Sequence, residues 1–141
     1  MNKLTLFFTV FFFAAPVWAE EPERTIDIDI IGVEAGKGQL MIGICTKQQF
    51  LSPACEISEV FPATNDWKQR VSVNAPHTGE YAIQVAYDRN GDNELSSNRY
   101  GAPTEPVGFS NNPKTYMRAP KFSEVAVDLK DVTAPISIKL K

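Results

Sequence analysis

Histidine and cysteine are scarce in this sequence, which has one histidine, His77, and two cysteines, Cys45 and Cys55. A zinc site needs several His, Cys or carboxylate ligands at short spacings, and a dithiol redox motif needs two cysteines separated by two residues. The chain offers neither pattern. His77 stands in a Pro-His-Thr-Gly segment that is typical of a solvent-facing turn, so no general-base role is expected for it. The sequence therefore gives little support to a zinc site, a dithiol redox site or catalysis by a histidine base.

Basic residues are also few, because 14 Lys and Arg stand against 17 Asp and Glu, which gives a net charge of −3. No basic stripe interrupts this mildly acidic balance, so nucleic acid is not an expected partner. Downstream of residue 19 there is no sustained 3.6-residue apolar period, internal repeat or low-complexity tract. These absences favour a single small domain that is not helical.

The first 19 residues have the parts of a bacterial signal peptide. Lys3 supplies a short basic segment, residues 4–15 form an apolar run, and Val17-Trp18-Ala19 resembles a cleavage site. The apolar run is too short to cross a bilayer comfortably, because a spanning helix needs about 20 apolar residues. An uncleaved anchor is the alternative. A lipoprotein is not expected, since no cysteine lies near the cleavage point.

Cleavage after Ala19 would leave a domain at residues 20–141, which is 141 − 19 = 122 residues, in the periplasm or outside the cell and with no membrane span. In such an oxidising compartment two cysteines allow one pairing, so Cys45 and Cys55 are predicted to form a disulfide. On the chain-entropy model, closing this short loop stabilises the fold by about 3 kcal/mol.

Alternation of apolar and polar residues predicts a series of short strands. The clearest are residues 25–30, where Ile alternates with Thr and Asp, and residues 81–87, which are rich in aromatic and β-branched side chains. The other predicted strands are residues 39–45, 56–61, 69–73, 125–129 and 136–141. A Gly-Lys-Gly turn at residues 36–38 predicts that the first two strands pair as a hairpin.

These seven strands predict an all-β fold, a single antiparallel β-sandwich of the immunoglobulin-like or transthyretin-like kind with one long loop. The loop is the segment at residues 88–122, which has little strand character and many Asn, Gly and Pro residues. A loop of this length in a small domain is usually either functional or disordered.

The long loop and the strand before it carry a likeness to known proteins. The sequence reads GEYAIQVAYDRNGDNEL at residues 79–95 and GAPTEPVGFSNN at residues 101–112. These runs resemble the bacterial exported family catalogued as domain of unknown function two-one-four-one. The resemblance implies a secreted or periplasmic β-sandwich without an assigned activity. Where that family commonly continues as Asn-Gly-x-Leu-Asp, this chain has Asn93 in place of Gly and Ser96 in place of Asp.

The spacing Asp88-x-Asn90-x-Asp92 resembles the opening of a calcium loop, in which alternate oxygen-bearing side chains turn toward one cation. The candidate metal ligands are Asp88, Asn90, Asp92, Glu94 and Ser96. The pattern departs from an EF-hand at position six, which is Asn93, and at position twelve, which is Arg99 instead of a bidentate Glu. Asn is able to adopt the left-handed backbone conformation expected at position six.

The same residues also fit an ordinary hairpin turn at Asn90-Gly91, with Asp88 and Asp92 capping backbone amides. Both interpretations stay open at the level of sequence. If calcium binds, the small number of carboxylates predicts weak affinity, with a dissociation constant on the order of 0.1 to 1 mM, and a structural role.

Aromatic and polar side chains are mixed farther along the loop, which suits a sugar, peptide or small ligand. The candidate ligand-binding residues are Tyr100, Glu105, Phe109 and Asn111. Packing of the aromatics onto the sandwich is the alternative. Trp67 is likewise either an exposed binding aromatic or a residue partly buried at the sandwich edge. The run at residues 108–112 begins like a nucleophile elbow but ends in Asn and lacks a strand-to-helix context, so no catalytic residue is assigned.

Together these patterns predict a non-catalytic exported binding or accessory module, whose loop from Asp88 to Phe109 is ordered by internal contacts, with weak calcium binding kept as the open alternative at its start. The expected partner is a protein, a glycan or a small ligand. Two alternatives stay open: a structural protein associated with the cell envelope, and an enzyme of an unrecognised type.

Overall fold

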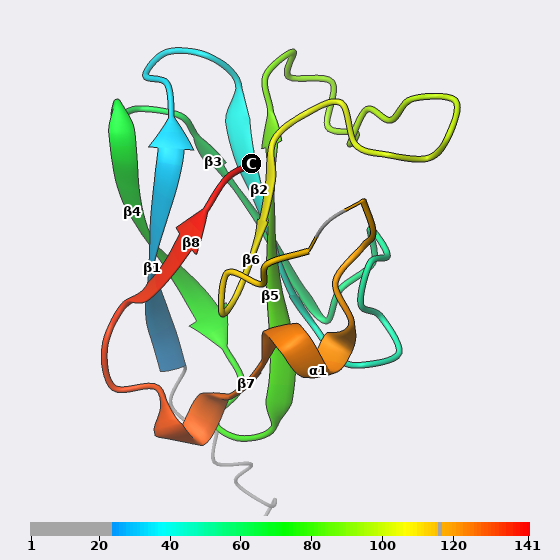
Figure 1. Ribbon diagram of the computed structural model, residues 1–141. Helices are drawn as coiled ribbons and strands as arrows, with labels where there is room; N and C mark the ends of the chain where they lie inside the picture. Colours follow the sequence, from blue (N-terminus) through cyan, green and yellow to red (C-terminus); the bar gives the residue numbers. More distant parts are fainter. Residues whose placement is uncertain (1–23, 116) are drawn as a thin grey trace, which may run out of the picture.

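The computed structural model describes residues 24–115 and 117–141 (Figure 1). The predicted signal peptide, residues 1–19, lies outside them. Within the described residues the chain forms eight strands, one short α-helix and one 3₁₀ turn. In chain order these are β1 (Arg24–Val33), β2 (Gln39–Cys45), β3 (Ile57–Pro62), β4 (Trp67–Ala75), β5 (Glu80–Asp88), β6 (Val107–Phe109), α1 (Phe122–Val125), β7 (Ala126–Asp128), η1 (Leu129–Asp131) and β8 (Ile136–Lys139).

The strands form two sheets that enclose one core, which confirms the predicted all-β sandwich. The first sheet has the order β4-β1-β8, and the second has the order β3-β2-β5-β6, with β7 also paired to β5. In β4 the buried Val71 and Val73 alternate with the exposed Arg70 and Ser72, so one face of the strand packs on the core. The immunoglobulin-like or transthyretin-like subtype stays a prediction.

The predicted hairpin between the first two strands is wrong, because β1 and β2 lie in different sheets. The connection at residues 34–38 carries the chain from one sheet to the other (Figure 1). Both edges of β1 are occupied, by β4 on one side and by β8 on the other. The β1–β8 pair is parallel, with Ile28 opposite Ile136 and Ile30 opposite Ile138, and is the one departure from antiparallel pairing among the named strands.

The segment after β5 contains more regular structure than the sequence predicts. Strand β6 lies inside the predicted long loop and pairs with β5. The strand predicted at residues 125–129 is reduced to β7, because the helical turn α1 precedes it and η1 follows it. Glu124 holds α1, since its carboxylate pairs with Arg118 and accepts the N–H of Lys121. These hydrogen bonds, from Arg118 and then from Lys121, lower the pKa of Glu124 to about 2.

The predicted disulfide is confirmed, with Cys45 at the end of β2 bonded to Cys55. The residues between the two cysteines lie against β5, where Gln84 binds them through both ends of its amide. Its Nε2 donates to the carbonyl of Ser52 at 2.9 Å, and its Oε1 accepts the N–H of Leu51 at 3.2 Å. The disulfide therefore fastens a covering segment to the outer face of the β3-β2-β5-β6 sheet.

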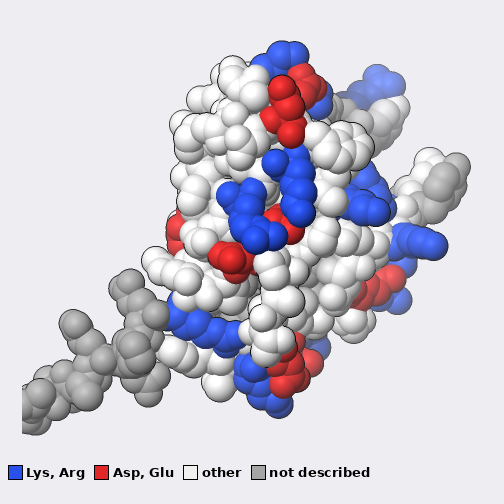
Figure 2. Space-filling view, turned by 90° about the vertical axis from the view of Figure 1, so that its left-hand side faces the viewer, with Lys and Arg blue, Asp and Glu red and all other residues white. Residues whose placement is uncertain are grey.

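The outer face of the β4-β1-β8 sheet is polar, with basic and acidic side chains side by side (Figure 2). Asp29 lies 2.6 Å from Arg70 and 2.8 Å from Lys68. The hydrogen bonds from Arg70 and Lys68 hold the pKa of Asp29 well below its usual range. In the part of the chain that the structure describes, no helix has the length and apolar character needed to cross a membrane.

Candidate functional site

The long connection from β5 to β6 begins at Asp88, whose side chain is fully buried. Its carboxylate accepts three hydrogen bonds. Oδ1 accepts the N–H of Gly91 at 2.6 Å, and Oδ2 accepts the N–H of Asn93 at 2.9 Å. Oδ2 also accepts Nε2 of Gln39 at 2.8 Å. Because Gln39 belongs to β2, Asp88 ties the start of the loop to the neighbouring strand.

Burial is the largest single influence on the pKa of Asp88, and by itself it would raise that pKa. Hydrogen bonds from Gln39 and from the backbone N–H groups of Asn93 and Gly91 favour the carboxylate instead. Together they outweigh burial and lower the pKa of Asp88. Asp88 is therefore an ionised group that organises the turn around it.

Asn90 and Asp92 complete this turn. Oδ1 of Asn90 accepts the N–H of Asp92 at 3.1 Å, and Nδ2 of Asn90 donates to Oδ2 of Asp92 at 2.8 Å. Oδ1 of Asp92 accepts the N–H of Glu94 at 2.9 Å. Asn93 has a φ of 64°, in the left-handed region where a calcium loop has glycine. The capping of backbone amides by Asp88 and Asp92 considered from the sequence is thus present, but Asn90-Gly91 does not form a hairpin, because the next strand paired with β5 is β6, at Val107–Phe109.

The structure brings three of the predicted calcium ligands, Asp88, Asn90 and Asp92, into this one turn. Glu94 is exposed, and Ser96 donates its N–H away from the turn, to Glu105. Within residues 24–115 and 117–141, no group of three or more His, Cys, Asp or Glu side chains is placed to hold a metal ion. A cation at the turn would share oxygen atoms that already accept N–H groups, so the geometry is compatible with low affinity only.

Glu105 fastens the far end of the loop to its beginning. Its Oε1 accepts the N–H of Arg89 at 2.9 Å, and its Oε2 accepts the N–H of Ser96 at 3.1 Å. Between these points the chain folds back on itself, with a bridge between Ser97 and Pro103. The loop is therefore cross-linked at both ends by carboxylates that accept backbone N–H groups.

Tyr100 lies in this folded-back segment and is 78% exposed. The guanidinium of Arg99 lies 4.7 Å from the centre of the Tyr100 ring. Oδ1 of Asn98 accepts the N–H groups of Tyr100 and Ala102, at 2.9 and 3.1 Å, and so fixes the backbone of this turn. An exposed ring on a fixed turn, with a cation beside it, is suited to stacking with a ligand.

The other two predicted ligand-binding residues contact the protein itself. The ring of Phe109 packs edge to face on Phe50, with 5.9 Å between the ring centres, and Phe50 packs in the same way on Phe122. Nδ2 of Asn111 donates to the carbonyl of Ala126 at 3.0 Å. These contacts are the ones expected from the packing alternative.

Ser110 and Asn112 connect separate parts of the sandwich. The Ser110 side chain is fully buried, and its hydroxyl accepts the N–H of Ile83 at 3.0 Å and donates to the carbonyl of Val125. Asn112 pairs with β8 as a strand would, through two 2.7 Å bonds to its backbone. The sequence pattern does not predict these roles, because polar side chains after a strand are equally typical of a loop.

Three connections meet at the end of the sandwich from which the long loop projects, and we call this region the loop end (Figure 1). They are residues 34–38, 63–66 and 89–106. Two hydrogen bonds and one ion pair connect them. The N–H of Gly36 donates to the carbonyl of Ala63 at 2.8 Å, and the N–H of Ala35 donates to Oδ1 of Asp66 at 2.7 Å. Arg89 pairs with Glu34 at 3.3 Å. Trp67, the first residue of β4, lies at the same end and is 71% exposed.

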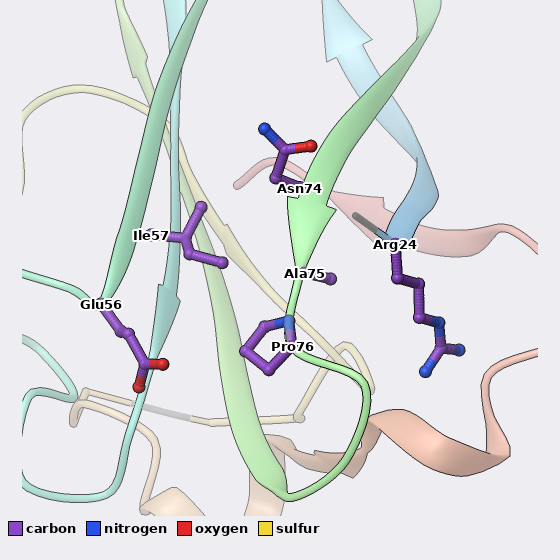
Figure 3. Close-up of a pocket in the computed structure, with 6 residues that line it drawn as sticks. All are labelled: Arg24, Glu56, Ile57, Asn74, Ala75 and Pro76. Carbon is purple, nitrogen blue, oxygen red and sulfur yellow. The ribbon is translucent and has the colours of Figure 1, made fainter. Parts of the chain in front are cut away.

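A hollow of about 310 Å³ lies at the opposite end, between the start of β3 and the end of β4 (Figure 3). It is lined by Arg24, Glu56, Ile57, Asn74, Ala75 and Pro76. The Arg24 guanidinium donates to the carbonyls of His77 and Val132, and the Glu56 carboxylate accepts the Tyr81 hydroxyl at 3.2 Å. Its two charged side chains are thus already engaged by the protein, which makes the hollow a weaker candidate than the loop end.

Comparison with known proteins identifies a family. The sequence profile of a family described as an uncharacterized protein conserved in bacteria (DUF2141) matches residues 28–137. No curated protein and no solved structure matches the chain. The matched span runs from β1 into β8, so it covers both sheets, the Asp88 turn and the Ser110 and Asn112 contacts. The resemblance noted in the sequence is thereby confirmed, and the chain belongs to the DUF2141 family of uncharacterized bacterial proteins.

Proposed function

We propose that this protein is a non-catalytic exported binding or accessory module, and that its binding surface is the loop end. The observation that carries the proposal is the way the long loop is held. Asp88 and Glu105 each fasten two backbone N–H groups of the loop. A long loop in a small domain is usually functional or disordered, and these cross-links favour the first alternative.

Exposed aromatic side chains on this rigid end support binding. Trp67 and Tyr100 leave most of their surface exposed to water, so burial of these two side chains contributes little to the stability of the fold. Rigid aromatic residues are frequent anchors in binding sites, because they offer a large contact area with few rotatable bonds. The backbone under each ring is fixed by side-chain hydrogen bonds, from Asp66 near Trp67 and from Asn98 at Tyr100.

The bonding of the polar side chains supports a non-catalytic role. The hydroxyl of Ser110 and the carboxylates of Asp88 and Glu105 all bind backbone groups, where they stabilise the fold. A catalytic nucleophile or base must instead reach a substrate.

Export is part of the proposal. The first 19 residues have the pattern of a signal peptide, and disulfides such as Cys45–Cys55 persist in oxidising compartments. The periplasm or the extracellular medium is the proposed location, and a protein, glycan or small molecule found there is the proposed partner.

Photo-crosslinking in cells tests the binding surface. A benzophenone-bearing phenylalanine analogue replaces Tyr100 in one variant and Lys130 in a matched control, since Lys130 lies in η1 at the opposite end (Figure 1). We expect adducts of defined mass from position 100 and none from position 130, because the benzophenone reacts only with groups in contact. Equal yields at both positions, or no adduct at position 100, would contradict the proposal.

We also propose that the Asp88 turn binds calcium weakly and in a structural role, through the oxygens of Asp88, Asn90 and Asp92. At a dissociation constant of about 1 mM, about 10 mM calcium would stabilise the fold by about 1.4 kcal/mol. The expected result is a rise of several degrees in Tm relative to chelator, with no rise in magnesium, measured by thermal unfolding.

Asp92→Asn is the informative variant for this measurement, because Asp92 is exposed and its removal leaves the Asp88 bonds in place. The calcium-dependent rise should disappear in Asp92→Asn and persist in Asp131→Asn, an exposed acid at the opposite end. Calcium binding at this turn is refuted if the Tm does not rise, or if the rise survives in Asp92→Asn.

A further inference from the structure

Trp67 has a backbone conformation that a tryptophan rarely adopts. Its φ is 67°, in the left-handed region, and the N–H of Lys68 donates to the carbonyl of Asp66 at 2.8 Å. A hydrogen bond between residues two apart, around a centre with this φ, defines the classic γ-turn, which is rare and strained. A bulky side chain in this region costs free energy that glycine or asparagine would largely avoid.

The surrounding structure holds the strained turn from two sides. The buried amide of Gln69 accepts the N–H of Thr64 at 2.8 Å and donates to the carbonyl of Pro62 at 2.9 Å. Asp66 accepts the N–H of Ala35 from the neighbouring connection. The fold therefore imposes the conformation at position 67, whatever side chain stands there.

The fold gains little in return from an indole at this position, because the Trp67 side chain is 71% exposed. A strained residue that contributes little burial indicates a role outside the fold itself. The sharp turn also directs a rigid, flat ring into solvent at the loop end.

The surroundings of Trp67 indicate which class of ligand fits it. Its neighbours Asn65, Asp66 and Lys68 are polar and exposed. The other exposed large apolar side chains of the described residues lie outside the two connections that meet at Trp67; they are Leu51, Val60, Leu95, Tyr100 and Met117. A protein partner usually needs a contiguous apolar patch of several hundred Å². A single ring with a polar rim fits a sugar, whose C–H face stacks on an indole while its hydroxyls bind polar groups such as Asn65. Lys68 already pairs with Asp29, and Oδ1 of Asp66 accepts the N–H of Ala35.

We propose that Trp67 is a saccharide contact, held in a strained γ-turn so that its ring stays exposed. The inference rests on the proposed binding function of the loop end and specifies its ligand class. The proposal makes two independent predictions: Trp67 binds sugar, and replacing Trp67 does not weaken the fold.

The experiment combines fluorescence and thermal unfolding on the exported protein. The probes are cellotetraose, chitotetraose and maltotetraose in the millimolar range, with a soluble tetrapeptide as the control ligand. Trp67 is the only tryptophan in residues 20–141, so its emission reports contact at the ring. We expect a saturable change in emission with at least one saccharide and none with the tetrapeptide. The Trp67→Asn variant supplies the background emission, and Lys130→Ala, at the opposite end of the sandwich, should retain the response.

Trp67→Asn and Trp67→Gly should leave the Tm unchanged or raise it by a few degrees, because they relieve the left-handed strain and remove little buried surface. A clear fall in Tm in both variants would make Trp67 a structural residue and overturn the proposal. No emission change with any of the saccharides would also overturn it, as would a response to the tetrapeptide alone. The proposed function would survive these failures if cross-linking at Tyr100 succeeds, so the two are distinguishable.

Discussion

Replacing Gly38 with alanine is expected to destabilise the protein strongly. A Cβ atom at this position would overlap the carbonyl oxygen of Asp88 and lie 2.7 Å from Cα of Arg89. Both are backbone atoms at the end of β5, so a rotamer change cannot relieve the overlap. Gly38 also has a φ of 66°, which alanine disfavours. The expected loss is about 4 kcal/mol or more, a large part of the 5–15 kcal/mol typical of a small domain.

Gly36→Ala is the matched control for Gly38→Ala. Gly36 has nearly the same backbone conformation, with a φ of 73°, but a Cβ atom there would meet nothing within 4 Å. Its cost should be the conformational penalty alone, about 1–2 kcal/mol. Denaturant unfolding of both variants measures the difference. Similar losses of stability in the two would show that the close approach of Gly38 to β5 is not what requires glycine.

The sequence predicts the strands of this fold better than it predicts their neighbours. Alternation in residues 25–30 and the aromatic and β-branched residues at 81–87 predict strands, and β1 and β5 occupy those segments. Alternation does not show which strand lies alongside. The Gly-rich turn at residues 36–38 is therefore compatible with a hairpin in the sequence, although in the structure it connects two sheets. The parallel partner of β1 is β8, at the far end of the chain, and no local pattern indicates this pairing.

At the candidate site, too, the sequence predicts the local contacts and not the long-range ones. The spacing of Asp88, Asn90 and Asp92 is sufficient to predict a tight turn in which side-chain oxygens face inward, because the interactions are local. The bonds that fix the turn in place come from residues distant in the sequence, Gln39 on β2 and Glu105 at the far end of the loop. These contacts depend on the strand order, so they could not be predicted before the topology was known.

Asp88→Ala is expected to destabilise the protein by about 3–5 kcal/mol, because it leaves three donors without their acceptor. These are the N–H groups of Gly91 and Asn93 and the side-chain amide of Gln39. Asp88→Asn keeps one acceptor oxygen and should cost less, about 2 kcal/mol. Denaturant unfolding measures both losses. Asp92→Asn, whose side chain is exposed, is the control and should cost under about 1 kcal/mol.

Acid unfolding tests whether the folded protein holds Asp88 as a charged carboxylate. The pKa of Asp88 in the folded protein is lowered, because the hydrogen bonds from Gln39 and the backbone outweigh the effect of burial. A carboxylate with a lowered folded pKa stabilises the fold fully above its unfolded pKa of about 3.9, and this stabilisation is lost as the pH falls toward the folded pKa. The wild-type free energy of unfolding should therefore decrease below about pH 4, and Asp88→Asn should show a shallower decrease over that range.

The ion pairs of Asp29 with Arg70 and Lys68 contribute a separate part of the acid dependence, which Asp29→Asn removes. Because the two sites share no partner, the double variant should lose the sum of both contributions to the acid dependence. If the free energy of unfolding of Asp88→Asn falls with pH as steeply as that of the wild type, Asp88 is not held as the carboxylate around which the loop is built.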